Sequence, residues 1–86
     1  MHLVLYTSAF CEPCRQTRAV LAEAERLVPA ARLSEFDVVR YETQAAGEGI
    51  STTPTVIVRS DDGAEVFRAE GVPTLRQVLA AAARAV

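Results

Sequence analysis

The residues best suited to chemistry are two cysteines separated only by Glu12 and Pro13. An apolar run, residues 2–7, precedes them, and a segment with helical periodicity follows. The pair therefore falls where a predicted strand passes into a predicted helix. Unpaired N–H groups and the dipole at a helix N-terminus favour an anion and lower the pKa of a thiol placed there. We predict that Cys11 is the exposed, attacking sulfur and that Cys14, one turn further on, is the more buried, resolving sulfur.

A cysteine pair of this kind is suited to thiol–disulfide exchange. Attack by Cys11 on a substrate disulfide would give a mixed disulfide, and attack by Cys14 on Cys11 would release the reduced substrate. A zinc site is a poor alternative, because zinc needs a full tetrahedral set of ligands and His2 is the only further His or Cys. A purely structural disulfide would close a very short loop, which gives little stabilisation. We therefore expect no metal.

The elements that must position the pair follow an α/β pattern. Strands are predicted over residues 2–7, 32–39, 53–58 and 64–69, and helices over residues 15–28, 41–48 and 75–84. Pro13 suits the first turn of the first helix, where its missing N–H is not needed. The order is β-α-β-α-β-β-α. The helix between the first two strands predicts that they are parallel, and the Asp62-Gly63 turn predicts an antiparallel hairpin at the end.

Length and composition indicate one globular domain, residues 1–86. Half of the residues (50%) are apolar, which suits a dense core, and the charged fraction of 23% argues against disorder. The net charge of −2 gives no basic surface for nucleic acid or for an anionic membrane. All nine cationic residues are Arg, which excludes lysine-based catalysis. We expect a monomer.

The cysteine count and the N-terminal residues bear on the compartment. Two cysteines are too few for a disulfide-rich secreted scaffold. The apolar start lacks Lys and Arg and does not lead to a small-residue cleavage site, so we expect no signal peptide. No uncharged stretch approaches the ~20 residues of a spanning helix. These features predict a protein of the reducing cytoplasm.

Two segments of the sequence resemble the thioredoxin superfamily. The first, Phe-Cys-Glu-Pro-Cys (residues 10–14), is similar to the aromatic-Cys-x-Pro-Cys active site, with Phe10 where thioredoxins carry Trp. The second, Ile-Ser-Thr-Thr-Pro-Thr (residues 50–55), is similar to the loop that precedes the cis-proline of that family. The resemblance covers essentially the whole chain. It implies a thioredoxin-like fold, a four-stranded mixed sheet flanked by helices.

The resemblance also implies roles for residues around the pair. Thr53–Pro54 is expected to be a cis bond packed against the cysteines, with the backbone of Thr53 pairing with a substrate strand. Gly71, followed by Val72, would let a substrate approach beside the last strand. Without the resemblance, Pro54 would be an ordinary trans proline, because only about 5–6% of X–Pro bonds are cis.

Four residues next to the sulfurs are expected to modulate their reactivity: Phe10, Glu12, Pro13 and Arg15. Two of these have a simpler reading. Phe10 would otherwise be an aromatic core residue, and Arg15 a solvated helix residue with no effect on the thiolate.

Other features of the sequence help to decide whether it resembles glutaredoxins or thioredoxins more closely within the superfamily. Residues 4–7 are similar to a glutaredoxin first strand, but the glutathione-binding Gly-Gly and Asp are absent, and Ala-Glu-Gly-Val-Pro (residues 69–73) stands in their place. Residues 41–54 are similar to thioredoxin. Leu5 occupies the position of the buried Asp of thioredoxins, so no proton acceptor for Cys14 is evident, although Glu35 could approach from the second strand.

We therefore predict a thioredoxin-like protein-disulfide reductase that uses Cys11 and Cys14 and no bound cofactor. Its partners would be disulfide-containing proteins and an upstream reductase of the thioredoxin reductase type. The alternatives are a glutaredoxin that uses glutathione and a non-enzymatic binding module whose disulfide switches a surface.

Overall fold

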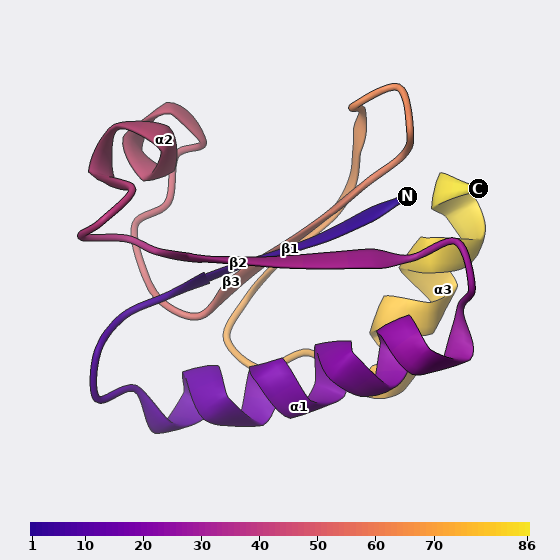
Figure 1. Cartoon of the computed structure of the whole chain (residues 1–86), viewed down its shortest axis with the longest axis horizontal. Helices are drawn as coiled ribbons and strands as arrows, with labels where there is room; N and C mark the ends of the chain where they lie inside the picture. The colour runs from indigo at the N-terminus through magenta and orange to yellow at the C-terminus, as the bar shows by residue number, and fades with distance from the viewer.

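The computed structural model describes all residues from 1 to 86 and consists of one sheet and three helices (Figure 1). The elements in chain order are β1 (His2–Thr7), α1 (Glu12–Leu27), β2 (Arg32–Asp37), α2 (Glu42–Gly47), β3 (Thr55–Arg59), β4 (Glu65–Glu70) and α3 (Leu75–Ala85). This β-α-β-α-β-β-α order is the predicted one. No helix combines the length and the apolar character needed to cross a membrane.

The four strands form a mixed sheet in the order β2-β1-β3-β4. β1 is parallel to β2 and antiparallel to β3, and β3 is antiparallel to β4. The inner position of β1 explains its apolar composition, because it is covered on both faces. Leu3 and Leu5 belong to the main core cluster, and Tyr6 belongs to a smaller cluster. The predicted pairing of the strands is confirmed.

The helices cover the two faces of the sheet unequally. α1 and α3 lie together on one side of the strands, and the short α2 lies near one end of the other side (Figure 1). The main cluster of 12 buried residues lies between the sheet, α1 and α3. Only Tyr6, Ala45 and Ile57 are buried in the smaller cluster near α2. The layer that carries α1 therefore contributes most of the apolar burial that stabilises the fold.

α1 differs from the prediction at both ends. It begins at Glu12 rather than at Arg15, because the sulfur of Cys11 caps it and Pro13 fits the first turn. Leu27 follows the buried Ala24 at helical spacing, yet it is 45% exposed. The chain leaves the helix at Val28, which packs against the main cluster, while Leu27 remains on the outside of the last turn.

Two predicted strands also have different limits. β2 ends at Asp37 rather than at Val39, because the Asp37 carboxylate accepts hydrogen bonds from the N–H groups of Val39 (2.9 Å) and Arg40 (3.1 Å) and forms a turn. β3 begins at Thr55 rather than at residue 53, because Thr53 and Pro54 lie in a loop.

The remaining boundaries differ from the prediction by a single residue at most. Two local signals explain this agreement. The β3–β4 hairpin turns at Gly63, which has a positive φ of 89°, as the Asp-Gly sequence predicts. α3 begins with a capping box of Thr74 and Gln77, a sequence pattern typical of a helix start.

Candidate active site

The two cysteines lie where β1 passes into α1, and they form a disulfide with a Cα–Cα distance of 5.2 Å. Cys11 is the N-cap residue and is partly exposed, whereas only 1% of Cys14 is accessible. Cys14 is covered because it lies one helical turn further on, on the face of α1 that packs against the sheet. The predicted difference in exposure between the two sulfurs is therefore found in the structure.

The backbone at the start of α1 is directed at the sulfur of Cys11. The N–H of Cys14 donates a hydrogen bond to Cys11 Sγ at 3.1 Å, so the sulfur takes the place of an oxygen in an ordinary N-cap. The same N–H group and the positive end of the helix dipole would stabilise a negative charge on Cys11 after reduction. Such a site lowers the pKa of a thiol and makes the thiolate available for attack.

The loop between β1 and α1 presents Phe10 to solvent. Phe10 is fully exposed and has a φ of 56°, a left-handed conformation that is uncommon for a bulky residue. The reading of Phe10 as a core residue is therefore wrong. Its exposed ring next to Cys11 is available for contact with another molecule.

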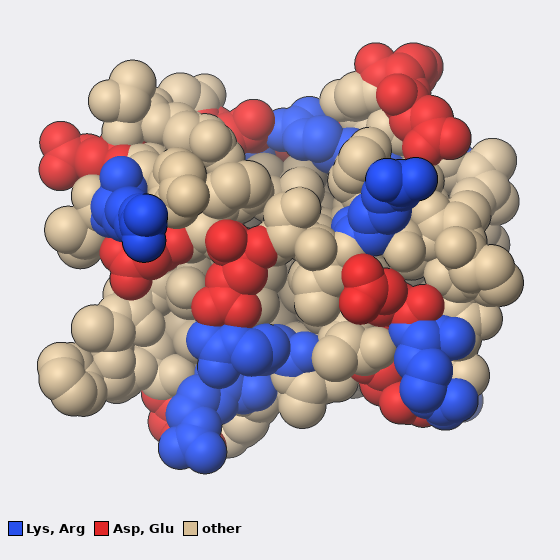
Figure 2. Space-filling model, in the orientation of Figure 1, with Lys and Arg blue, Asp and Glu red and all other residues tan.

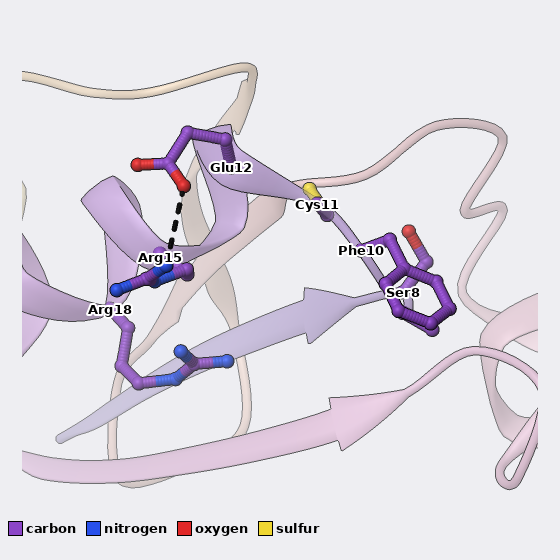
Figure 3. A pocket seen from close by; sticks show the side chains of 7 residues that line it. Ser8, Phe10, Cys11, Glu12, Arg15 and Arg18 are labelled. Atoms are coloured by element: carbon purple, nitrogen blue, oxygen red, sulfur yellow. Dashed lines mark ion pairs between the residues drawn. The ribbon is translucent and has the colours of Figure 1, made fainter.

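A pocket of about 490 Å³ opens beside Cys11 (Figure 3). Its lining residues are Ser8, Ala9, Phe10, Cys11, Glu12, Arg15 and Arg18. Figure 3 shows the ring of Phe10 on one side of Cys11 and the charged side chains of α1 on the other. Sequence reasoning missed Arg18. Its spacing was the available signal, because it lies three residues after Arg15 and seven after Cys11, on the same side of the helix.

Two ion pairs lie at or beside this pocket. Arg15 Nη1 is 3.6 Å from Glu12 Oε2, and both side chains are at least 67% exposed. Arg18 instead holds Glu35 by two bonds of 2.7 Å, from Nε and Nη2. The hydrogen bonds from Arg18 hold the pKa of the Glu35 carboxyl below its usual value, and those same bonds raise the pKa of Arg18. The second pair is therefore the more firmly fixed.

Glu35, considered above as a proton acceptor for Cys14, makes no hydrogen bond to that residue. Its carboxylate accepts bonds from Arg18 and from the hydroxyl of Thr7 (3.2 Å). Leu5, at the position where thioredoxins carry Asp, is completely buried in the main apolar cluster. The structure assembles no group of three or more side chains suited to holding a metal ion.

The loop before β3 lies beside the loop that carries the cysteines. A hydrogen bond of 2.6 Å joins the hydroxyl groups of Ser8 and Thr53. The Thr53–Pro54 bond is cis, as the resemblance implied, so the alternative of a trans proline is wrong. Pro54 is buried, and its carbonyl accepts a hydrogen bond from the N–H of Gly71 at 2.9 Å. The fold thus brings Gly71 beside the Thr53–Pro54 segment, although it lies 17 residues after Pro54 in the sequence.

Comparisons with known proteins agree on one family. The thioredoxin family model matches residues 1–84. Thioredoxin of Fasciola hepatica is 25% identical, with a TM-score of 0.80, and the match covers 99% of this chain and 80% of that one. Thioredoxin 1 of Thermosipho africanus is 18% identical, with a TM-score of 0.83 and coverage of 98% and 92%. Thioredoxin-2 of a malaria parasite is 13% identical, with a TM-score of 0.86 and coverage of 96% and 81%. No curated protein matches the chain.

Proposed function

Because the chain belongs to the thioredoxin family, we propose that it is a thiol–disulfide oxidoreductase that reduces protein disulfides. The observation that carries the proposal is the bond between Cys11, a partly exposed N-cap residue, and the buried Cys14. Cys11 can be reached by a large substrate. Cys14 is buried from a large substrate but is bonded to the sulfur of Cys11, which is what a resolving cysteine requires.

The reaction begins with the reduced protein. The Cys11 thiolate attacks one sulfur of the substrate disulfide, forms a mixed disulfide and expels the other substrate sulfur as a thiolate, which takes a proton from water. Cys14 then loses its proton to solvent and attacks Cys11 Sγ. The bond between Cys11 and the substrate breaks, the second substrate sulfur leaves as a thiolate that takes a proton from water, and the Cys11–Cys14 disulfide remains. Two electrons have passed from the protein to the substrate.

The substrate would be held as an extended strand. Neither the N–H nor the C=O of Thr53 has a hydrogen-bond partner within the chain, so both are free to pair with a peptide backbone. The exposed ring of Phe10, which lines the pocket beside Cys11, and the half-exposed Val72, which follows Gly71, would supply apolar contacts. Pairing through the backbone is tolerant of sequence, as a general protein-disulfide reductase requires.

The electrons would come from an upstream reductase of the thioredoxin reductase type rather than from glutathione. The support is the segment that follows β4, where Gly71 and Val72 occupy the place of the glutathione-binding Gly-Gly and Asp of glutaredoxins. We propose further that the protein acts as a cytoplasmic monomer without a bound cofactor.

The test is insulin reduction measured with two electron donors. In one assay NADPH and a thioredoxin reductase regenerate the dithiol, and in the other NADPH, glutathione reductase and glutathione do so. We expect turnover only in the first assay. Turnover only with glutathione would identify a glutaredoxin. Activity in neither assay, together with failure of the chemically reduced protein to reduce insulin stoichiometrically, would favour the redox-switched binding module.

A further inference from the structure

We propose that the pocket beside Cys11 selects protein disulfides in which an acidic side chain flanks the attacked cysteine, and that Arg15 and Arg18 bind that carboxylate. The inference rests on the proposed function, since it names the substrates that the same site would prefer. It concerns a side-chain contact in addition to backbone pairing at Thr53.

The position of the two arginines is the first argument. Both line the pocket that contains Cys11, and Figure 3 shows their side chains on the α1 side of the sulfur, opposite the ring of Phe10. On the face shown in Figure 2, a group of blue side chains lies over the N-terminal half of α1. A substrate cysteine joined to Cys11 would therefore bring its neighbouring side chains within reach of two guanidinium groups.

Arg15 has donors that the protein does not use. Its only partner, Glu12, is 3.6 Å away, and no hydrogen bond joins the two side chains. Both are largely exposed, so their attraction is weakened by water. A substrate carboxylate can form the bidentate contact that Glu12 does not make with Arg15. Glu12 would then act as a competitor for Arg15.

Arg18 is held in place before any substrate arrives. Its Nε and Nη2 groups bind Glu35, which is itself held by Thr7 of β1. The Nη1 group makes no hydrogen bond within the chain and remains available. A guanidinium that is already fixed loses little side-chain freedom when it binds a ligand. Because Glu35 offsets much of its charge, we expect Arg18 to contribute less than Arg15.

The experiment measures how fast the reduced protein is oxidised by short disulfide-linked peptide homodimers, capped at both ends. The peptides are identical except for glutamate or glutamine next to the cysteine. The protein itself supplies both electrons, so no reductase is needed, and acid quenching followed by chromatography gives the second-order rate constant. We expect the glutamate peptide to react about two- to fivefold faster at low salt, the range for an exposed ion pair. The ratio should approach one near 1 M salt, where the Debye length is only about 3 Å.

We expect two single variants to change the ratio of the glutamate to the glutamine rate constant in opposite directions. Arg15→Gln should lower it towards one, and Glu12→Gln should raise it. The double variant Arg18→Gln/Glu35→Gln removes the second guanidinium without changing the local charge, and it should lower the ratio to a smaller extent. The matched control is Arg26→Gln/Glu23→Gln, which removes an ion pair of the same kind at the far end of α1 and should leave the ratio unchanged.

Four outcomes would overturn the inference. Equal rates for the two peptides, or a ratio that Arg15→Gln does not change, would show that the arginines of the pocket do not bind the side chain next to the substrate cysteine. A reaction with glutathione disulfide faster than with either peptide would show that the arginines serve a small acidic disulfide instead. Failure to reduce either peptide and insulin would contradict the proposed function itself, whereas the first three outcomes would contradict only the selection of acidic substrates.

Discussion

Replacement of Glu12 by glutamine should lower the pKa of the Cys11 thiol and raise the reduction potential of the cysteine pair. Glu12 is the first residue of α1 and directly follows Cys11. Once the disulfide is reduced, its carboxylate is a like charge beside the thiolate and disfavours it. Arg15, 3.6 Å from Glu12, opposes this effect without cancelling it, because no hydrogen bond joins the pair. Removing the carboxylate therefore stabilises the thiolate, and with it the reduced protein.

The size of the effect follows from the exposure of these groups. Glu12 is 67% exposed and Arg15 is 75% exposed, so water screens the interaction to about 0.3–1 kcal/mol. This energy corresponds to a fall of about 0.2–0.7 in the pKa of Cys11. For a two-electron couple it also corresponds to a rise of about 6–20 mV in the potential.

The assay is the ultraviolet absorbance of the thiolate as a function of pH, combined with redox equilibration of the wild type and the variant against a glutathione buffer. Arg15→Gln is the matched control and should shift both quantities in the opposite direction, while the double variant Glu12→Gln/Arg15→Gln should lie between the two single variants. A higher Cys11 pKa in Glu12→Gln would refute the reasoning, because it would mean that the carboxylate does not act on the sulfur through its charge.

Three further predictions concern ligand binding and stability. Millimolar glutathione should cause no localised chemical-shift changes in the reduced protein, and a saturable response centred on Thr53 and Gly71 would instead identify a glutaredoxin. Because Arg18 lowers the pKa of Glu35 in the folded protein, the unfolded chain binds more protons in acid, so the free energy of unfolding should fall as the pH drops below about 4.5. Glu35→Gln should flatten this fall by no more than ~1 kcal/mol, since both partners are partly exposed, and identical pH curves would contradict it. Leu21→Ala, in the main core cluster, should reduce the free energy of unfolding by about 2–5 kcal/mol, measured by urea denaturation, and a loss below ~1 kcal/mol would show that this core is loosely packed.

Much of the fold could be predicted because its signals are local in the sequence. The capping box at Thr74, the Asp-Gly turn at Gly63 and the alternation of strand and helix periods each depend on a few neighbouring residues. The limits of β2 and α1 were missed where a side chain replaced the regular pattern. Asp37 bends the chain away from the β-branched residues that follow it, and the sulfur of Cys11 starts a helix that propensity places later.

The site was only partly predictable, because some of its contacts join distant segments. The cysteine spacing singled out the two sulfurs, and their different exposure is found in the structure. The bonds of Glu35 to Arg18 and Thr7 bring together β2, α1 and β1, and only the packing of α1 on the sheet reveals them. The exposure of Phe10 depends on its positive φ, which a sequence does not indicate for a residue other than glycine, asparagine or aspartate.

The most direct test of the central claim is to trap the reaction halfway. The Cys14→Ser variant, with Cys11 reduced, is mixed with insulin, quenched with acid and digested, and the disulfide-linked peptides are identified by mass spectrometry. If Cys11 is the attacking sulfur, Cys14→Ser should form a stable mixed disulfide between Cys11 and a substrate cysteine. Cys11→Ser should form little or no adduct under the same conditions. No adduct on Cys11, or an adduct on Cys14 of Cys11→Ser that forms at the same rate, would contradict the assignment of Cys11 as the attacking sulfur.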